Sequence, residues 1–167
     1  QSGESVLVSH NYLDASTTAD YFSSAPKISA DGRYVAYSSV ADDLVSGVTD
    51  TNSNFDVFRY DAQTGLSDLV SYVDGDDTTT PAQGSDTPRI SGDGAVIVFV
   101  SQSSDLVSGD SNSVNDVFAW GITASNTAPT ASVTSVGAVR LEGTSIAVTG
   151  SGSDAEQASG TLSYAWE

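Results

Sequence analysis

A short run of oxygen-bearing side chains is the strongest candidate for chemistry in this sequence. Asp50, Asn52, Asn54 and Asp56 occupy alternate positions of the heptapeptide Asp-Thr-Asn-Ser-Asn-Phe-Asp. Ca²⁺ prefers six to eight oxygen ligands, and tight loops with this spacing can supply them. Phe55 stands where an EF-hand loop requires glycine, which disfavours a true EF-hand. The spacing predicts a calcium site, with the alternative that Asp and Asn only cap hairpin turns.

A second loop further along the chain has a similar composition and a different spacing. It carries Asp110, Asn112, Asn115 and Asp116. The same two interpretations apply to it, calcium binding through side-chain oxygens or capping of a tight turn. Both loops are therefore candidate metal sites.

The residue types needed for catalysis are sparse. His10 is the only histidine and cysteine is absent, so no histidine triad for a metal and no thiol nucleophile can form. The sequence contains neither the Gly-x-Ser-x-Gly nucleophile elbow nor the His-Glu-x-x-His zinc motif. Paired carboxylates could still serve glycoside hydrolysis, because 22 acidic residues always yield some close pair. We predict that the chain is not an enzyme.

The charge of the chain, its lack of long apolar runs and its first residue limit the classes of partner and the location that we expect. Five Lys and Arg residues oppose 22 Asp and Glu residues, giving a net charge of −17, so no basic patch for nucleic acid can form. No apolar run approaches the roughly 18 residues of a membrane-spanning helix, and we expect no membrane insertion. The chain begins at Gln1, which favours a secreted or cell-surface protein whose signal peptide has been removed.

An internal repeat organises the chain as far as Trp120. Pro26-Lys27-Ile28-Ser29-Ala30-Asp31-Gly32 recurs as Pro88-Arg89-Ile90-Ser91-Gly92-Asp93-Gly94. The same offset in numbering relates Asp43-Leu44-Val45-Ser46-Gly47 to positions 105–109 and Leu7-Val8-Ser9 to positions 69–71. A slightly shorter offset relates Asp56-Val57-Phe58 to positions 116–118, because the loop before them is shorter in the second copy. Four anchors in one order identify two copies of one structural unit.

Each copy of the repeat reads as short β-strands. The predicted strands of the first copy are 26–29, 34–38, 57–60 and 67–71. Those of the second copy begin at Pro88 and include 96–100 and 117–120, and β-branched and aromatic residues dominate these runs. The Asp-Gly pairs after Ser29-Ala30 and Ser91-Gly92 are hairpin signals. No segment has a helical period, so the predicted fold class is all-β, with two four-stranded units. The second copy ends at Trp120 without a fourth strand of its own, and residues 5–9 form an orphan strand of that type.

The repeat resembles the TolB-type, WD-like β-propeller repeat of secreted bacterial proteins. The resemblance covers roughly residues 3–120 and rests on the Pro-x-Ile-Ser-x-Asp-Gly turn, the aromatic-rich second strand, the Asp-Leu-Val-Ser-Gly corner and the Asp-Val-Phe strand. It implies that the copies, about 26–87 and 88–123, are propeller blades. A closed propeller has about four to eight blades, and two are encoded here.

The C-terminal part of the chain resembles the opening half of a polycystic-kidney-disease-type (PKD) Ig-like domain. Residues 124–129 read as a linker, and strands are expected at 131–136, 139–141, 145–149 and 162–166. The resemblance rests on Asn126-Thr127-Ala128-Pro129, Glu142-Gly143, Gly152-Ser153-Asp154 and the terminal Tyr164-x-Trp166 strand. It implies a partial β-sandwich over residues 130–167, since such a domain needs about seven strands.

Two functions are compatible with this organisation. The favoured one is a structural subunit of an extracellular assembly such as a filament, because open sheet edges must be covered and residues 5–9 of one copy could complete the second repeat of the next by strand addition. The result would be a homo-oligomer or polymer, with calcium as a stabiliser. The alternative is an accessory module that holds a secreted enzyme or adhesin on polysaccharide. Loop aromatics could then stack on sugars, namely Tyr12, Tyr21, Phe22 and Tyr72.

Overall fold

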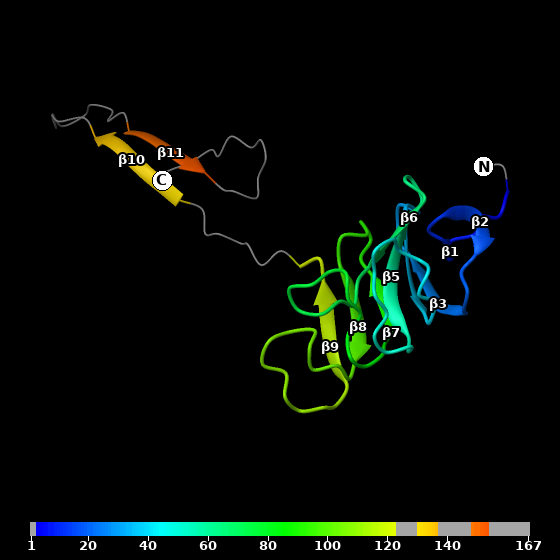
Figure 1. Ribbon diagram of the computed structural model, residues 1–167. Coiled ribbons are helices and arrows are strands. Elements are labelled where there is room, and N and C mark those ends of the chain that lie inside the picture. The colour runs from blue at the N-terminus through cyan, green and yellow to red at the C-terminus, as the bar shows by residue number, and fades with distance from the viewer. Residues whose placement is uncertain (1–2, 123–129, 137–147, 154–167) are drawn as a thin grey trace. The chain divides into compact units, whose positions relative to one another are not determined.

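The computed structural model describes residues 3–122, 130–136 and 148–153 (Figure 1). Every regular element in these ranges is a β-strand, which confirms the predicted all-β class. The chain divides into two compact units, Gln1–Ile122 and Thr123–Glu167. The described ranges contain no helix of the length and apolar character needed to span a membrane.

The first repeat forms a four-stranded antiparallel sheet, called here the first sheet. Its strands are β3 (Ser23–Ile28), β4 (Tyr34–Ser39), β5 (Asp56–Asp61) and β6 (Leu66–Leu69), and they pair in chain order. The predicted Asp-Gly turn joins the first two, with Gly32 at a φ of 76° that glycine adopts without strain. Asp31 holds this turn by accepting hydrogen bonds from the Ser29 hydroxyl and the Arg33 backbone N–H.

The second repeat forms the three-stranded second sheet. Its strands are β7 (Ser85–Ile90), β8 (Ile97–Ser101) and β9 (Asp116–Trp120), again paired in chain order. Both sheets carry the same irregularity in their opening strand, where Ala25 and Thr87 adopt φ values of 51° and 56° immediately before a proline. Within the described residues, no strand pairs with the outer edge of β9.

The two sheets pack face to face, as Figure 1 shows for β3–β6 and β7–β9. A buried apolar core lies between them, made by Ala36, Val57, Val70, Ile97, Phe99 and Leu106. Burial of such side chains contributes about 25 cal/mol for each Å² removed from water. A second core covers the opposite face of the first sheet, where Tyr37, Phe58, Tyr60 and Leu69 meet Val8 and Ala19 of the N-terminal segment.

The N-terminal segment differs from the expected strand at residues 5–9. These residues pair with no strand, and the first regular elements are instead the short antiparallel strands β1 (His10–Asn11) and β2 (Asp14–Thr18). Val8 packs against the first sheet, whereas Val6 is 69% exposed. The physical reason is that β5 already pairs with β6, so the first sheet offers no third strand with a free edge to this segment.

The C-terminal unit is described over one antiparallel pair. β10 (Thr130–Val136) pairs with β11 (Val148–Ser153), with Thr130 opposite Ser153 and Val136 opposite Val148. The first strand coincides with the prediction for 131–136, and the second begins later than the predicted 145–149. The predicted linker at 124–129 and the predicted strands at 139–141 and 162–166 lie outside the described residues.

Candidate functional site

The first acidic loop folds back on its own backbone. Asp50 Oδ1 accepts hydrogen bonds from the backbone N–H groups of Asn52 (2.8 Å) and Ser53 (2.9 Å) and from the Thr80 hydroxyl (3.3 Å). The Asn52 side-chain oxygen accepts a hydrogen bond from the Asn54 N–H. These contacts are the turn-capping geometry of Asp and Asn. The side chain of Asn54 turns away and donates to the Asn52 carbonyl.

Asp56 is the exception in this loop, because its carboxyl group is buried. The residue is 2% exposed, and its oxygens accept hydrogen bonds from the Ser71 hydroxyl (3.2 Å) and the Asn52 amide (3.4 Å). Burial, followed by repulsion from the Asp50 carboxylate, raises the pKa of Asp56 to about 8. The folded protein therefore holds a proton here at a pH where an unfolded aspartate has lost it.

The second acidic loop matches the first more closely than its spacing suggests. The Asn112 backbone N–H donates to Asp110 Oδ1 (3.3 Å) and its side-chain amide donates to Asp116 Oδ2 (2.9 Å), as Asn52 does with Asp50 and Asp56. Ser53 and Ser113 share the left-handed conformation, with φ values of 53° and 55°. The structural equivalent of Asn54 is therefore Val114, and Asn115 takes the place of Phe55. The second loop consequently presents fewer equivalent oxygens.

Calcium at either loop stays a prediction. Among the described residues no three histidine or acidic side chains gather as a metal cluster, so a cation would depend on amide and carbonyl oxygens. If the first loop binds Ca²⁺, adding the ion should raise the melting temperature, because a ligand of the folded state stabilises it by mass action. Calorimetry with and without chelator checks this. An unchanged melting temperature, together with no bound metal in elemental analysis, would contradict calcium binding.

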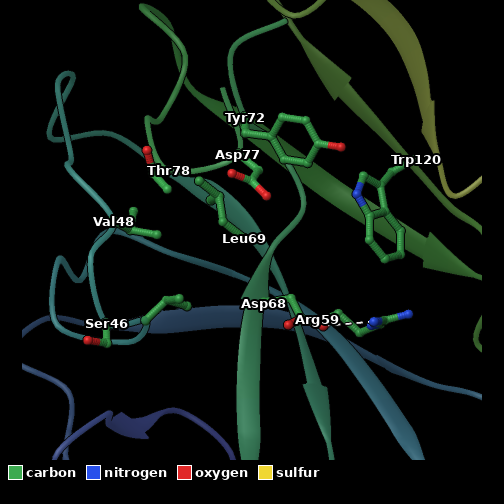
Figure 2. A pocket seen from close by; sticks show the side chains of 10 residues that line it. Ser46, Val48, Arg59, Asp68, Leu69, Tyr72, Asp77, Thr78 and Trp120 are labelled. Atoms are coloured by element: carbon green, nitrogen blue, oxygen red, sulfur yellow. Dashed lines mark hydrogen bonds and ion pairs between the residues drawn. The ribbon is translucent and has the colours of Figure 1, made fainter. Parts of the chain in front are cut away.

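A cavity of about 400 Å³, called here the rim cavity, opens between the outer parts of the two sheets (Figure 2). β5 and β6 supply Arg59, Asp68 and Leu69, and the last residue of β9 supplies Trp120. The connection between the two sheets supplies Tyr72, Asp77 and Thr78. Figure 2 shows the rings of Tyr72 and Trp120 as the two aromatic walls, with Asp77 near them.

Arg59 joins the two sheets beside this cavity. Its guanidinium carbon lies 4.8 Å from the ring centroid of Tyr34 in β4 and 4.5 Å from that of Trp120 in β9. Cation–π contacts of this kind contribute about 0.5–2 kcal/mol. One terminal nitrogen of Arg59 also donates to Asp68 Oδ2 on the neighbouring strand at 2.7 Å. Both charges are thus committed to contacts within the protein.

Two residues that line the rim cavity, Tyr72 and Trp120, have repeat equivalents that contact each other on the first sheet. There His10 meets the Tyr60 ring edge-on at 5.9 Å, and its Nε2 lies 3.0 Å from the Gly65 carbonyl oxygen. Tyr72 and Trp120 are the repeat equivalents of His10 and Tyr60. Leu69 on β6 lies in the same buried cluster as Tyr60. Trp120, at the end of β9, therefore corresponds in the repeat to Tyr60 of the first sheet.

The predicted loop aromatics are dispersed. Tyr72 lines the rim cavity, whereas Tyr21 and Phe22 are each 62% exposed and Tyr12 is 41% exposed. Phe22 contacts Phe55 edge-on, with ring centroids 5.2 Å apart. Arg59, Asp68 and Trp120 were not predicted from the sequence as site residues. Their signal was the repeat itself, since the third strands of the two copies carry Arg59-Tyr60 and Ala119-Trp120 at equivalent positions.

Comparisons with protein-family models, curated proteins and solved structures found no match to this chain. The resemblances to propeller and PKD-type repeats therefore stay predictions. The rim cavity and the outer edge of β9 are the two features of the described residues that could bind a partner or ligand.

Proposed function

We propose that this chain is a non-catalytic extracellular structural protein whose copies join by β-strand addition, with propeller-type blades as its repeat units. The donor would be residues 4–9 of one copy, called here the donor segment, and the acceptor would be the outer edge of β9 in another. The observation that carries the proposal is that the donor segment is the repeat equivalent of β6 and the two residues after it.

The donor segment already lies where its repeat equivalent predicts. Leu7-Val8-Ser9 is identical to Leu69-Val70-Ser71, and Val8 packs on the first sheet as Val70 packs between the two sheets. The chain beyond it follows the same path. The Tyr12 N–H donates to the Asp43 carbonyl at 2.9 Å, and the equivalent Asp74 N–H donates to the Asp105 carbonyl at 2.8 Å. Residues 4–7 precede this shared path, as β6 precedes it in the first repeat.

The pairing of β5 with β6 defines the register expected at β9. The observed pairs are Phe58 with Leu69, Arg59 with Asp68, and Tyr60 with Ser67. The intermolecular pairs follow when each β5 residue is replaced by its equivalent in β9 and each β6 residue by its equivalent in the donor segment. These pairs are Phe118 with Leu7, Ala119 with Val6, and Trp120 with Ser5.

In one of these pairs, both residues are apolar where both repeat equivalents are charged. Arg59 and Asp68 form a cross-strand ion pair at 2.7 Å within the first sheet. Their equivalents, Ala119 and Val6, are both apolar and both exposed, Val6 at 69%. A charge on only one side would leave an unpaired ion at the joint, which cross-strand pairing disfavours. The joint replacement supports Ala119 and Val6 as partners.

Backbone groups and the rim cavity supply the remaining contacts. The Val70 N–H donates to the Val57 carbonyl at 2.8 Å, so Val8 should donate to Val117 of the acceptor. Hydrogen-bonded pairs alternate along antiparallel strands, which places the Val6 N–H on the Ala119 carbonyl. Leu7, like Leu69 beside Tyr60, would place its side chain toward Trp120 in the rim cavity.

Substituting proline at Val6 tests this pairing without disturbing the single chain, where Val6 is exposed. Val6→Pro removes the central N–H of the donor segment, and proline is excluded from positions that donate within a sheet. We expect assembly to weaken at least about tenfold, the equivalent of about 1.4 kcal/mol. Sedimentation equilibrium measures it, with Val6→Thr as the control that keeps the N–H. Equal assembly of the two variants would count against strand addition.

The negative charge fits an assembly outside the cell. A net charge of −17 keeps single chains apart at low ionic strength and is screened in salt solution, where the Debye length is about 8 Å at 0.15 M. Assembly should therefore strengthen as salt is added. Calcium, if the acidic loops hold it, would act in the same direction.

The rim cavity favours a second candidate function, the binding of a saccharide. Tyr72 and Trp120 offer aromatic faces for a sugar ring, and Asp77 and Thr78 offer acceptors and a hydroxyl beside them. Fluorescence titration with neutral oligosaccharides tests this, using Trp120→Phe as the control for the signal. Saturable binding that the donor segment displaces would mean that the sugar and the added strand share the cavity. No fluorescence change on titration would count against saccharide binding and would leave the structural role as the remaining proposal.

A further inference from the structure

The buried interface between the two sheets can be compared, position by position, with the surfaces that a second copy of the chain could use. On the first sheet it uses Ala36 and Ser38 of β4 and Val57 of β5, all of them fully buried. The Ser38 hydroxyl donates to Asp86 Oδ1 of the second sheet at 2.7 Å. The two sheets are thus joined by apolar packing and this side-chain hydrogen bond. Backbone hydrogen bonds from Ser85 to Phe55 and from Ala30 to Gly92 also link the two repeats.

The outer face of the second sheet repeats these positions. Val98, Val100 and Val117 are the repeat equivalents of Ala36, Ser38 and Val57, and all three are apolar. Val117 is 76% exposed. Val98 and Val100 are half-buried. Together with the exposed Val117, they place apolar side chains on this face next to the free edge of β9, where a protein partner could bind.

A small cavity on the opposite side of the first sheet provides the matching surface. It has a volume of about 180 Å³ and is lined by Val8, Ser9, Ser23, Ser24, Pro26, Val35 and Tyr37. Each of these residues has a repeat equivalent at the internal interface. Those equivalents are Val70, Ser71, Ser85, Asp86, Pro88, Ile97 and Phe99. All but Asp86 are buried there, so the same positions line an open cavity on one side and a closed interface on the other.

We infer that the outer face of the second sheet, formed by Val98, Val100 and Val117, docks on this cavity in a second copy of the chain. The inference rests on the proposed strand addition, because the donor segment of the same second copy would enter β9 beside this face. The contact repeats the internal step between the sheets, so each copy adds two sheets to a continuous stack. Val100 would meet Ser24, as Ser38 meets Asp86.

One position departs from the template. Gly84 leaves only 3.1 Å between an added Cβ and the Asn54 side chain of the first repeat, and the repeat equivalent of Gly84 is Phe22. The intermolecular interface must therefore open at this end, where Phe22 now contacts Phe55. Phe22→Gly restores the internal sequence at this position, and we expect it to strengthen assembly.

Single cysteines test the docking, because the chain contains no cysteine of its own. One preparation carries Ser24→Cys and a second carries Val100→Cys, and they are mixed under mild oxidation. Docking predicts a disulfide between the two variants in excess of either homodimer. The double variant Ser38→Cys with Asp86→Cys calibrates the geometry, since those side chains touch within one chain.

The same mixing experiment with Val6→Cys and Ala119→Cys separates this inference from strand addition. Disulfides in both mixtures support both contacts. A disulfide for Val6 with Ala119 and none for Ser24 with Val100 overturns the docking and leaves strand addition in place. Absence of both disulfides overturns both. Val117→Asp, on the exposed face, should remove the Ser24–Val100 disulfide while leaving the melting temperature of the single chain unchanged.

Discussion

Replacing Asp56 with asparagine is expected to stabilise the folded chain by about 2–4 kcal/mol at pH 8 in calcium-free buffer. Asp56 is 2% exposed, and burial together with the nearby Asp50 carboxylate raises its pKa to about 8. Between the unfolded pKa near 4 and this value, the folded state binds one more proton than the unfolded state. Stability therefore falls as the pH rises across this window.

Asparagine removes this dependence, because it is neutral at every pH and its side-chain oxygen can still accept from Ser71. Urea unfolding of the wild type and the variant at pH 5 and pH 8 measures the effect. The matched control is Asp116→Asn at the more exposed equivalent position, where a change below about 1 kcal/mol is expected. Parallel pH profiles for wild type and Asp56→Asn would show that Asp56 is not the buried acid described here.

Removing residues 1–9 is expected to abolish ordered assembly. The truncated chain keeps the free edge of β9 and loses the segment that is proposed to fill it. Native mass measurement should then find monomers or irregular aggregates, whereas the intact chain is expected to form a defined series of oligomers or a polymer. Unchanged assembly after truncation would contradict strand addition.

A peptide of residues 3–9 provides the complementary control for the truncation. Added to the truncated chain, it should bind the edge of β9 and quench or shift the fluorescence of Trp120, which lines the rim cavity. The same peptide with Val6→Pro should bind at least about tenfold more weakly. If both peptides bind equally, the interaction does not involve the backbone pairing proposed here.

The geometry of the stack decides the form of the assembly. Head-to-tail contacts between different surfaces close into a ring when their rotation permits, and otherwise form a filament. Closed propellers have about four to eight sheets, which corresponds to about two to four copies at two sheets each. Native mass therefore distinguishes a ring of defined size from an open series.

The strands of the repeat could be predicted from sequence because each has its own local signals. β-Branched runs such as 34–38 and 57–60 lie within β4 and β5. The predicted Asp-Gly turns are also present, with their glycines at positive φ. The donor segment could be recognised by its identity with positions 69–71. The sequence predicts that this segment is a strand without a partner in its own chain. It does not predict that residues 5–9 stay outside a regular strand, because a strand forms only when a neighbouring edge is available.

The acidic loops show a different limit of sequence reasoning. Alternating Asp and Asn residues favour calcium ligation and turn capping equally, and only the hydrogen bonds of Asp50 and Asn52 reveal the turns. The burial of Asp56 depends on Ser71 and the next strand, which are distant in sequence. The rim cavity brings Arg59 and Trp120 together from different sheets, so no local motif could indicate it.

The most direct test of strand addition is the disulfide between Val6→Cys in one chain and Ala119→Cys in another. Both side chains are exposed in the single chain, so their contact reports only the intermolecular strand pair. We predict that mixing the two variants gives their mixed disulfide as the main product. Val6→Cys mixed with Val117→Cys, which is out of register, should give much less. A mixture that yields only homodimers, or that favours Val117, would contradict the proposed joint.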